Sequence, residues 1–510
     1  MLHRSGWMRT LPRLAWIATG LLLAVLAGIS ALLAVRWPYT QDRVIASLES
    51  ATGSRVLLDR YRASFFPEPG CTIERLSLHR NAQQPIARAE RVTIRSSWWS
   101  LLTFRKRIRR IQAQELSVEI PSPVPPPIRS GSSGGLGDVI IREFVANGAA
   151  LEFVSAKDDA PARFVLHQLR LRDLGTDKQI AYATVLDIPD PPGQVKSSGT
   201  IGPFTSGTPG RTPVAGSFEL SGATLDKYKG LAGSIHSKGR FRGPLENMRI
   251  SGTAQVSAFE VNRTGRRVAL HTDYRAHVNT LSGDVILEGV QADFLRTRLS
   301  VNGFIQGAHG TVSLHFLGRK ARVEDLLALF TRSDPPALTG PIQLRADANL
   351  PPGEGPFLRR IRLRGDFEIS NARWARARTQ MKVNSLSARA RGDKEQVEDR
   401  AAGEVDHVLS QLRGNVILRN GLASLSDVTF RVPGATAGGS GTYNLLTKRV
   451  DLRGTVSMAA DASEATSGFK SLLLRPFNAL FRRSNEKGAT LPVSITGEYP
   501  RPRYRVGLRR

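Results

Sequence analysis

Histidine, cysteine and carboxylate side chains are the first candidates for chemistry in this sequence. None of the nine histidines lies in an H-E-x-x-H pattern or in another spacing typical of a metal site. His271 and His277 share the polar face of one predicted strand, where solvated histidines are the simpler interpretation. The single cysteine, Cys71, cannot form an internal disulfide or a multi-thiolate metal site. We therefore expect no metal and no other cofactor.

Two short segments match patterns of serine-nucleophile enzymes. Gly131 to Gly135 fits G-x-S-x-G, but a nucleophile elbow needs a strand before it and a helix after it, and this copy lies in a linker. Ser467 to Lys470 fits S-x-x-K without the S-D-N and K-T-G motifs that accompany that pattern. No pair stands out among the 44 acidic residues. The sequence predicts no catalytic residue, and we expect a protein that is not an enzyme.

The elements that would position any functional side chain are β-strands. Apolar and polar residues alternate in 267–278, 341–350, 360–370 and 449–458, which is the pattern of strands with one dry and one wet face. The sequence predicts a mainly β fold, in which an N-terminal transmembrane helix precedes a long, curled, mostly antiparallel sheet with a few short helices.

Glycines recur near the start of the predicted strands, and we interpret them as strand starts that follow turns. Their spacing is irregular, which predicts a meander rather than a propeller or a solenoid. The glycines concerned are Gly216, Gly252, Gly283, Gly310, Gly340, Gly365, Gly414 and Gly454.

Short helices are predicted at 39–53, 98–104, 323–330 and 469–483, the first ending at Gly53. A Pro/Gly/Ser-rich linker and a charged loop give the best boundaries. The predicted segments are a cytoplasmic N-terminus (1–13), a membrane span (14–35), an N-terminal β segment with short helices (36–120), the linker (121–138), a central β-meander or groove (139–391), the charged loop (392–406) and a C-terminal β segment (407–510) that carries the amphipathic helix 469–483.

An uncharged run of 22 residues, Leu14 to Val35, is long enough to cross a bilayer as a helix. It is longer than the apolar region of a signal peptide, so we favour an uncleaved anchor over a cleaved signal. Basic residues precede it, and the positive-inside rule then keeps the N-terminus in the cytoplasm. The rest of the chain would lie outside the cytoplasm.

The formal net charge is +28, which indicates an anionic partner or a solvated, arginine-rich surface. A translocated chain meets lipid headgroups, so no nucleic-acid partner is expected. One segment joins aromatic and basic residues in a way that suits a membrane surface, although a short helix packed on the end of the sheet, followed by a charged strand, is the favoured interpretation. These membrane-surface candidates are Trp98, Trp99, Arg105, Lys106, Arg107, Arg109 and Arg110.

The predicted sheet has too few helices to cover its apolar face. Either two sheets close on each other, or one curled sheet leaves an apolar trough open, and the sequence does not separate these alternatives. An open trough would suit acyl chains, because each buried CH₂ contributes about 0.8 kcal/mol. The candidate lining residues are Val268, Leu270, Val312, Leu314, Phe316, Ile342, Leu344, Ile361, Leu363, Phe367, Val450 and Leu452.

The N-terminal anchor and the stretch ATGSRVLLDRYRASFFPEPGCTIERLSL that follows it resemble the AsmA family of bacterial envelope proteins, which includes TamB-like and YhdP-like members. Later segments, such as GTYNLLTKRVDLRGTV, are also similar to that family. The motif positions are packing glycines and apolar residues, and Cys71 replaces a residue that is more often aliphatic. The matching positions are Thr52, Gly53, Val56, Phe66, Pro67, Pro69 and Gly70.

The resemblance implies a single-pass protein of the bacterial inner membrane, with its bulk in the periplasm. It also implies a β-groove that binds or conducts a membrane phospholipid or another envelope lipid during outer-membrane biogenesis. The alternative is a non-transporting scaffold or assembly factor, whose partner would be an outer-membrane or periplasmic protein.

Overall fold

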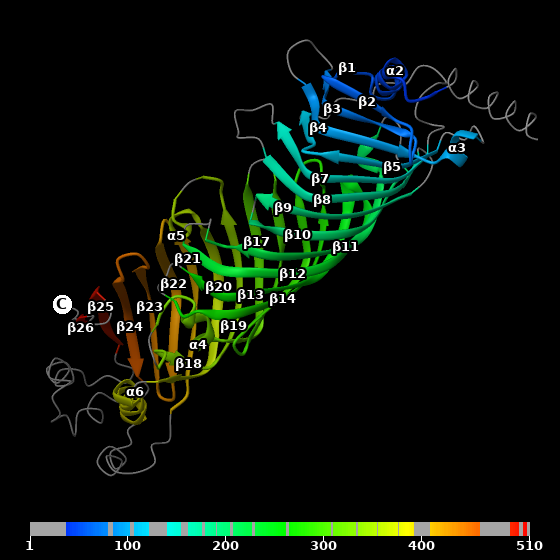
Figure 1. Ribbon diagram of the computed structural model, residues 1–510. Coiled ribbons are helices and arrows are strands. Elements are labelled where there is room, and N and C mark those ends of the chain that lie inside the picture. Colours follow the sequence, from blue (N-terminus) through cyan, green and yellow to red (C-terminus); the bar gives the residue numbers. More distant parts are fainter. Residues whose placement is uncertain are drawn as a thin grey trace, which may run out of the picture. The chain divides into compact units, whose positions relative to one another are not determined.

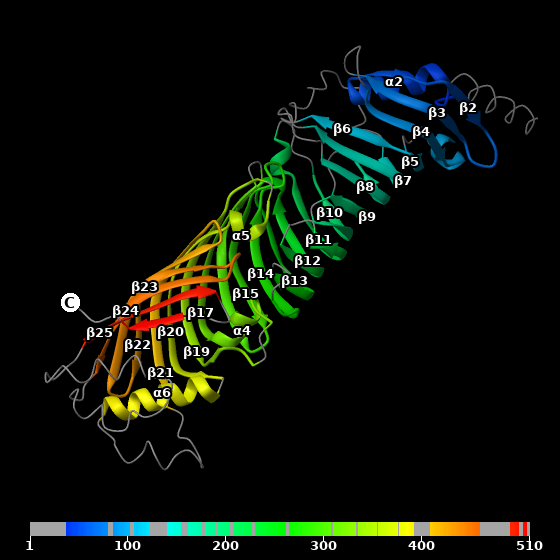
Figure 2. The same cartoon turned by 90° about the vertical axis from the view of Figure 1, so that its left-hand side faces the viewer.

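The computed structural model (Figures 1 and 2) describes residues 37–79, 85–102, 107–121, 140–154, 162–175, 179–189, 191–203, 208–226, 230–261, 265–307, 310–332, 335–353, 355–375, 377–391, 408–458, 490–498 and 503–506. Most of them lie in strands, so the prediction of a mainly β fold is confirmed. No helix in these residues is both long and apolar enough to span a bilayer. The predicted span 14–35, most of the linker 121–138, the loop 392–406 and the helix 469–483 lie outside the described residues.

The chain divides into two compact units, Met1–Tyr182 and Ala183–Arg510. The first contains two helices and eight complete strands among its described residues; strand β9 (Ile180–Pro189) runs across the boundary. Its elements are α2 (Gln41–Thr52), β1 (Arg55–Leu57), β2 (Arg60–Ser64), β3 (Gly70–His79), β4 (Pro85–Ser96), α3 (Trp98–Leu102), β5 (Arg107–Gln114), β6 (Ser117–Pro121), β7 (Ile140–Val154) and β8 (Ala162–Leu174).

Helix α2 confirms the helix predicted at 39–53. Gly53 follows it in the left-handed conformation (φ 61°) and donates its backbone N–H to the Glu49 carbonyl oxygen at 2.8 Å, which ends the helix as glycine commonly does. Val44 of α2 is buried with Cys71 and Ile73 of β3 and with Ile94 of β4. This packing gives the first unit an apolar core between the helix and the sheet.

Strand pairing in the first unit is antiparallel except at β7, which lies parallel to both β5 and β6. Parallel neighbours need a crossover connection, and the residues between β6 and β7 lie outside the described residues.

The second unit is an antiparallel meander in which each strand pairs with the next, apart from the short β18, which pairs with β20. The strands bend along their length (Figure 1). They are β10 (Pro192–Ile201), β11 (Pro213–Thr224), β12 (Leu231–Pro244), β13 (Met248–Val261), β14 (Val268–Val278), β15 (Val285–Phe294), β16 (Thr297–Gln306), β17 (Thr311–Arg322), β18 (Leu338–Thr339), β19 (Pro341–Leu350), β20 (Arg362–Trp374), β21 (Ser410–Arg419), β22 (Leu422–Val432), β23 (Ala435–Asn444), β24 (Arg449–Met458), β25 (Thr490–Glu498) and β26 (Arg503–Val506).

Short helices in the second unit follow strand ends. They are α4 (Val323–Ala328), α5 (Phe357–Arg360), α6 (Ala377–Ala390) and the single 3₁₀ turns at Pro209–Arg211 and Leu245–Asn247. Buried apolar clusters form where α4 and α6 meet the sheet. One contains Val323 and Ile369, and the other contains Val383 and Val432.

Helix α6 was not predicted from the sequence. Five described side chains of the helix are buried, but two of them are polar and two are alanine, so the apolar period is too weak to detect. They are Gln380, Val383, Ser387, Ala388 and Ala390. Inside the fold these polar groups have partners. The Ser387 hydroxyl donates to the Pro433 carbonyl oxygen at 2.8 Å, and the Gln380 amide donates to the Val408 carbonyl oxygen at 3.1 Å.

The interpretation of the recurring glycines as strand starts is wrong for five of the eight. Gly283, Gly310 and Gly340 do precede strands, but the other five lie inside them. For Gly252, Gly365, Gly414 and Gly454 the role is steric rather than turn-forming, because a Cβ at these four positions would meet a neighbouring strand. The five are Gly216, Gly252, Gly365, Gly414 and Gly454.

Candidate functional site

The candidate lining residues fall on one face of the second unit's sheet. Directly opposed partners on antiparallel strands point to the same face, so the register identifies its members. Leu314 of β17 is linked to Val450 of β24 through an unbroken series of such partners. The series is Leu314, Ala348, Leu363, Leu418, Ala423, Tyr443 and Val450.

A longer row runs beside it, from β10 to β25, and includes the predicted Phe316 and Leu452. At about 4.8 Å between strands, this row is about 65 Å long when measured along the sheet. It contains no charged side chain, and we call it the apolar row. Its members are Ser197, Phe218, Gly239, Gly252, Tyr274, Val290, Val301, Phe316, Ala346, Gly365, Val416, Leu425, Gly441, Leu452 and Ile495.

The remaining candidates occupy the same face in neighbouring rows. Val268 and Leu270 lie in β14, Leu344 pairs with Phe367, and Ile342 pairs with Ile369. Ile361 is the exception, because it precedes β20 as the residue that ends α5. The candidate lining residues that belong to strands therefore lie together on one face of the sheet.

The two faces of the sheet differ in the exposure of their side chains. Val301 is the one member of the apolar row that is buried, and the others are half-buried. The polar residues beside them in the strands, such as Arg364 and Arg453, are exposed. Fully buried apolar clusters in this unit are confined, within the described residues, to the places where α4 and α6 pack.

Aromatic rings on the apolar face lie over glycines of the next strand. A Cβ at Gly239 would be 2.9 Å from the Phe218 ring, and a Cβ at Gly252 would be 2.8 Å from the Tyr274 hydroxyl oxygen. Phe367 covers Gly414 in the same way, at 3.3 Å. The rings cover backbone that glycine would otherwise leave exposed, which is a known means of stabilising glycines in sheets.

A hollow of about 780 Å³ lies against β17 and β19–β23, and polar-face residues dominate its lining. Arg345 pairs with Asp366 and Glu368 pairs with Arg413, so opposite charges face each other across strands. Sequence reasoning missed this hollow. Charged polar-face residues occur all along the chain, and only the pairing shows which of them adjoin.

A second cavity, of about 190 Å³, lies in the first unit between Leu48 of α2 and strands β3, β4, β5 and β7. It is lined almost entirely by apolar side chains, among them Ile73, Val92 and Phe144. The sequence predicted α2 but gave no sign that it would leave this space.

The membrane-surface candidates divide into separate environments. Trp98 is half-buried and donates its indole N–H to the Pro67 carbonyl oxygen at 3.1 Å, whereas Trp99 is 74% exposed. Arg109 pairs with Glu68, and Arg110 pairs with Glu143 at 2.5 Å. Arg107 is exposed, and Arg105 and Lys106 lie outside the described residues.

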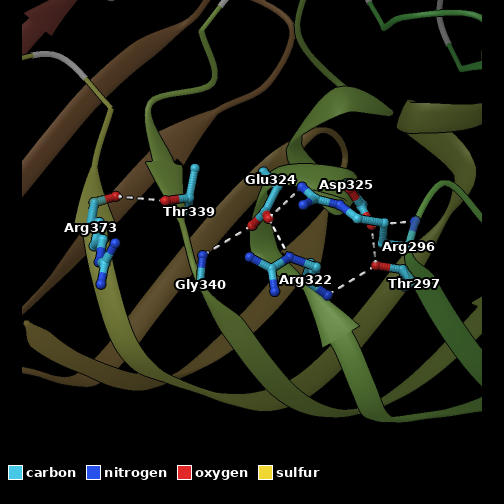
Figure 3. Close-up of polar contacts among 8 residues, drawn as sticks. All are labelled: Arg296, Thr297, Arg322, Glu324, Asp325, Thr339, Gly340 and Arg373. Atoms are coloured by element: carbon cyan, nitrogen blue, oxygen red, sulfur yellow. Dashed lines mark hydrogen bonds and ion pairs between the residues drawn. The ribbon is translucent and has the colours of Figure 1, made fainter.

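Buried carboxylates form a polar cluster at α4 (Figure 3). Glu324 accepts hydrogen bonds from the Arg296 guanidinium at 2.9 Å and from the Gly340 backbone N–H at 3.0 Å, and it also pairs with Arg322. Burial alone would raise the pKa of Glu324, but the hydrogen bonds from Gly340 and Arg322 outweigh it and lower that pKa.

Asp325, the next residue, accepts hydrogen bonds from the Arg296 backbone N–H at 2.9 Å and from the Thr297 hydroxyl at 2.8 Å. The cluster therefore connects the turn before β16 with α4 and with the start of β19. The hydrogen-bond donors to both carboxylates come from the chain itself, so the cluster has a structural role in joining these segments.

Catalytic chemistry gains no support in the part of the chain that the structure describes. No group of three or more potential metal ligands occurs there. His277 lies 2.7 Å from the Asn247 side-chain oxygen and 2.9 Å from Glu288, and His271 is exposed on the polar face. The two serine motifs, Gly131 to Gly135 and Ser467 to Lys470, lie outside the described residues.

Comparisons of the chain with protein-family models, with curated proteins and with solved structures found no match.

Proposed function

We propose that the second unit binds the acyl chains of a lipid along its apolar face, as a curled groove. The apolar row carries this proposal. The row is uncharged, half-buried and continuous across fifteen strands. It is much longer than the contact between two packed elements of a fold. Large apolar surfaces on soluble units usually mark binding sites.

The energetics favour an elongated apolar ligand over a compact one. Each CH₂ group removed from water contributes about 0.8 kcal/mol, so an acyl chain gains free energy in proportion to the length of row that it contacts. The bulky members alternate irregularly with glycine and alanine, as at Phe316, Ala346 and Gly365. Such a surface offers apolar contacts along its length, but its shape does not select one kind of lipid headgroup.

The cellular setting is part of the same proposal. The uncharged run 14–35 would anchor the chain in the bacterial inner membrane and place both units in the periplasm, as in the AsmA family that the sequence resembles. Envelope phospholipid would then be the ligand, and outer-membrane biogenesis the process that it serves.

Photo-crosslinking of the full chain tests this proposal with matched positions. A photoreactive amino acid replaces Leu363 or Leu452 on the apolar face and, as controls, Arg364 or Arg453 beside them on the polar face. Irradiation in membranes, followed by mass spectrometry, should give phospholipid adducts at 363 and 452 and few at 364 and 453. Equal labelling on both faces, or no lipid adduct at 363 and 452, would contradict acyl binding.

Protein adducts at 363 and 452 in place of lipid adducts would favour the scaffold alternative. A second measurement does not depend on the crosslinker. Leu363→Asn should reduce the phospholipid that co-purifies with the chain, whereas Arg364→Asn should leave it unchanged.

A further inference from the structure

The first unit exposes three large aromatic side chains at one end of its sheet. Phe66 is 86% exposed, Trp99 is 74% exposed and Phe65 is 57% exposed. Phe65 and Phe66 follow β2, and Trp99 belongs to α3. We call these three residues the aromatic edge.

The two segments that carry the aromatic edge are fixed to each other. The Trp98 indole donates to the Pro67 carbonyl oxygen at 3.1 Å, and the Ser96 backbone N–H donates to the Pro69 carbonyl oxygen at 2.8 Å. Arg109 of β5 pairs with Glu68 in the same turn. The aromatic residues are therefore held outward by a rigid surround and do not lie on a loose loop.

Packing within the unit does not account for this exposure. A fully buried aromatic side chain removes about 150–250 Å² from water, so three exposed ones leave a large apolar area in contact with solvent. Isolated exposed apolar residues are ordinary, but a group of large ones marks a surface that meets an apolar partner.

The position of the edge along the chain identifies the partner. The uncharged run Leu14 to Val35 ends two residues before Trp37. The Trp37 ring stacks on Phe65, with centroids 4.7 Å apart and planes at 27°, and its centroid is 6.0 Å from that of Trp98. If the run lies in a bilayer, the aromatic edge meets the interface of that bilayer, where tryptophan is favoured.

The charged residues around the aromatic edge also suit a bilayer as the partner. Arg95 and Arg109 both lie within 4.0 Å of Glu68, and Arg107 is exposed at the start of β5. These guanidinium groups could reach lipid phosphates while the rings enter the apolar boundary.

We infer that Phe65, Phe66 and Trp99 insert into the interfacial region of the bilayer that holds the N-terminal run, as a second contact that fixes the first unit against the membrane. This inference rests on the membrane location in the proposed function, and it is independent of acyl binding by the second unit.

Spin labels on the full chain in phospholipid vesicles test the insertion. Phe66→Cys and Trp99→Cys carry the label, and Leu57→Cys is the control. Leu57 is also an exposed apolar residue (47%), but it pairs with Ser77, near the opposite end of β3 from Gly70. Cys71 is 1% exposed and should not react with the label.

Labels at 66 and 99 should collide with dissolved oxygen more than with a water-soluble nickel complex, at a depth of about 5–10 Å. The label at 57 should show the reverse. Labels at 66 and 99 that behave like the one at 57 would overturn the insertion. Labels shielded from both reagents would also overturn it, because a protein partner would then cover the edge.

A triple variant, Phe65→Ser with Phe66→Ser and Trp99→Ser, separates this inference from the proposed function. In vesicles, it should increase the proteolysis of the turn before β3, and it should leave lipid crosslinking at 363 unchanged. Lost crosslinking at 363 with unchanged proteolysis would contradict the independence of the two surfaces.

Discussion

Tyr274 lies across Gly252 of the neighbouring strand, and its hydroxyl oxygen is 2.7 Å from the Ser237 hydroxyl oxygen one strand further on. Three strands are thus joined by one side chain on the apolar face. A second contact also restricts this position, because a Cβ at Gly252 would clash with the Lys238 carbonyl oxygen. The glycine is required by both the ring and the backbone.

Gly252→Ala should therefore lower the free energy of unfolding of the second unit by about 1–3 kcal/mol, the usual cost of overpacking. Gly438→Ala is the matched control, since a Cβ at Gly438 in β23 would have no heavy atom within 4 Å. We expect that control to change stability by less than about 0.5 kcal/mol. Urea unfolding measures both. An equal loss for the two variants would contradict the steric role of Gly252.

Glu324 should make stability depend on pH. Its pKa is lowered in the folded chain, so its ionised form contributes stability above the ordinary glutamate pKa of about 4.3, and this contribution is lost as the pH falls through the folded-state value. Glu324→Gln should cost about 1.5–3 kcal/mol at pH 7. The difference between the wild type and this variant should shrink below about pH 4.3.

Thr339→Val serves as the control for that measurement. It removes a neutral hydrogen bond of 3.4 Å to the Arg373 carbonyl oxygen, close to the same cluster. Its effect on urea unfolding should be the same at pH 7 and at acidic pH. A wild-type advantage over Glu324→Gln that persists unchanged in acid would show that charge is not the source of the stabilisation.

Cys71 should be inert in the folded chain. Burial raises the pKa of its thiol to about 11, against a partial opposing effect of Tyr61, and the residue is 1% exposed. Alkylation by iodoacetamide at pH 8 should be at least about 100-fold slower than in the urea-unfolded chain. Ser47→Cys, on the exposed side of α2, should react rapidly in the same folded protein. Fast native alkylation of Cys71 would show that α2 does not cover β3.

Arg242 and Arg249 are directly opposed on β12 and β13, and both are exposed. Neither makes an ion pair in the part of the chain that the structure describes. Like charges at opposed positions destabilise a sheet, so Arg249→Glu should raise the free energy of unfolding by about 0.2–1 kcal/mol.

Arg364→Glu should have the opposite sign, because Arg364 is opposed to Asp347 and the variant creates a like-charged pair. Both effects should diminish in 1 M salt, where the Debye length is about 3 Å. Urea titrations at low and high salt distinguish this electrostatic origin from a change in packing, which salt would not remove.

Much of the candidate site could be predicted from local alternation. In β19, Ile342 and Leu344 share one face while Gln343 and Arg345 share the other, as the period of a strand requires. The glycines could not be interpreted in the same way. Gly414 and Gly340 look alike in sequence, yet one lies under the Phe367 ring and the other precedes β19.

The residues of the aromatic edge were only partly found. Trp99 was noticed because it lies beside Trp98 and a basic segment, whereas Phe65 and Phe66 are 33 or more positions away in the sequence. The turn that carries them is held to α3 by the Trp98 hydrogen bond to Pro67, a contact between segments far apart in the chain.

The sequence by itself determined which side of each strand is apolar, where α2 ends and which 22 residues carry no charge, because these depend on neighbours a few positions apart. The tertiary structure alone decided that fifteen strands align their apolar residues in one row. That alignment depends on register, in which a shift of one residue would turn a whole strand over. It also decided that polar residues such as Gln380 and Ser387 could be buried in α6, since their hydrogen-bond partners lie in distant segments.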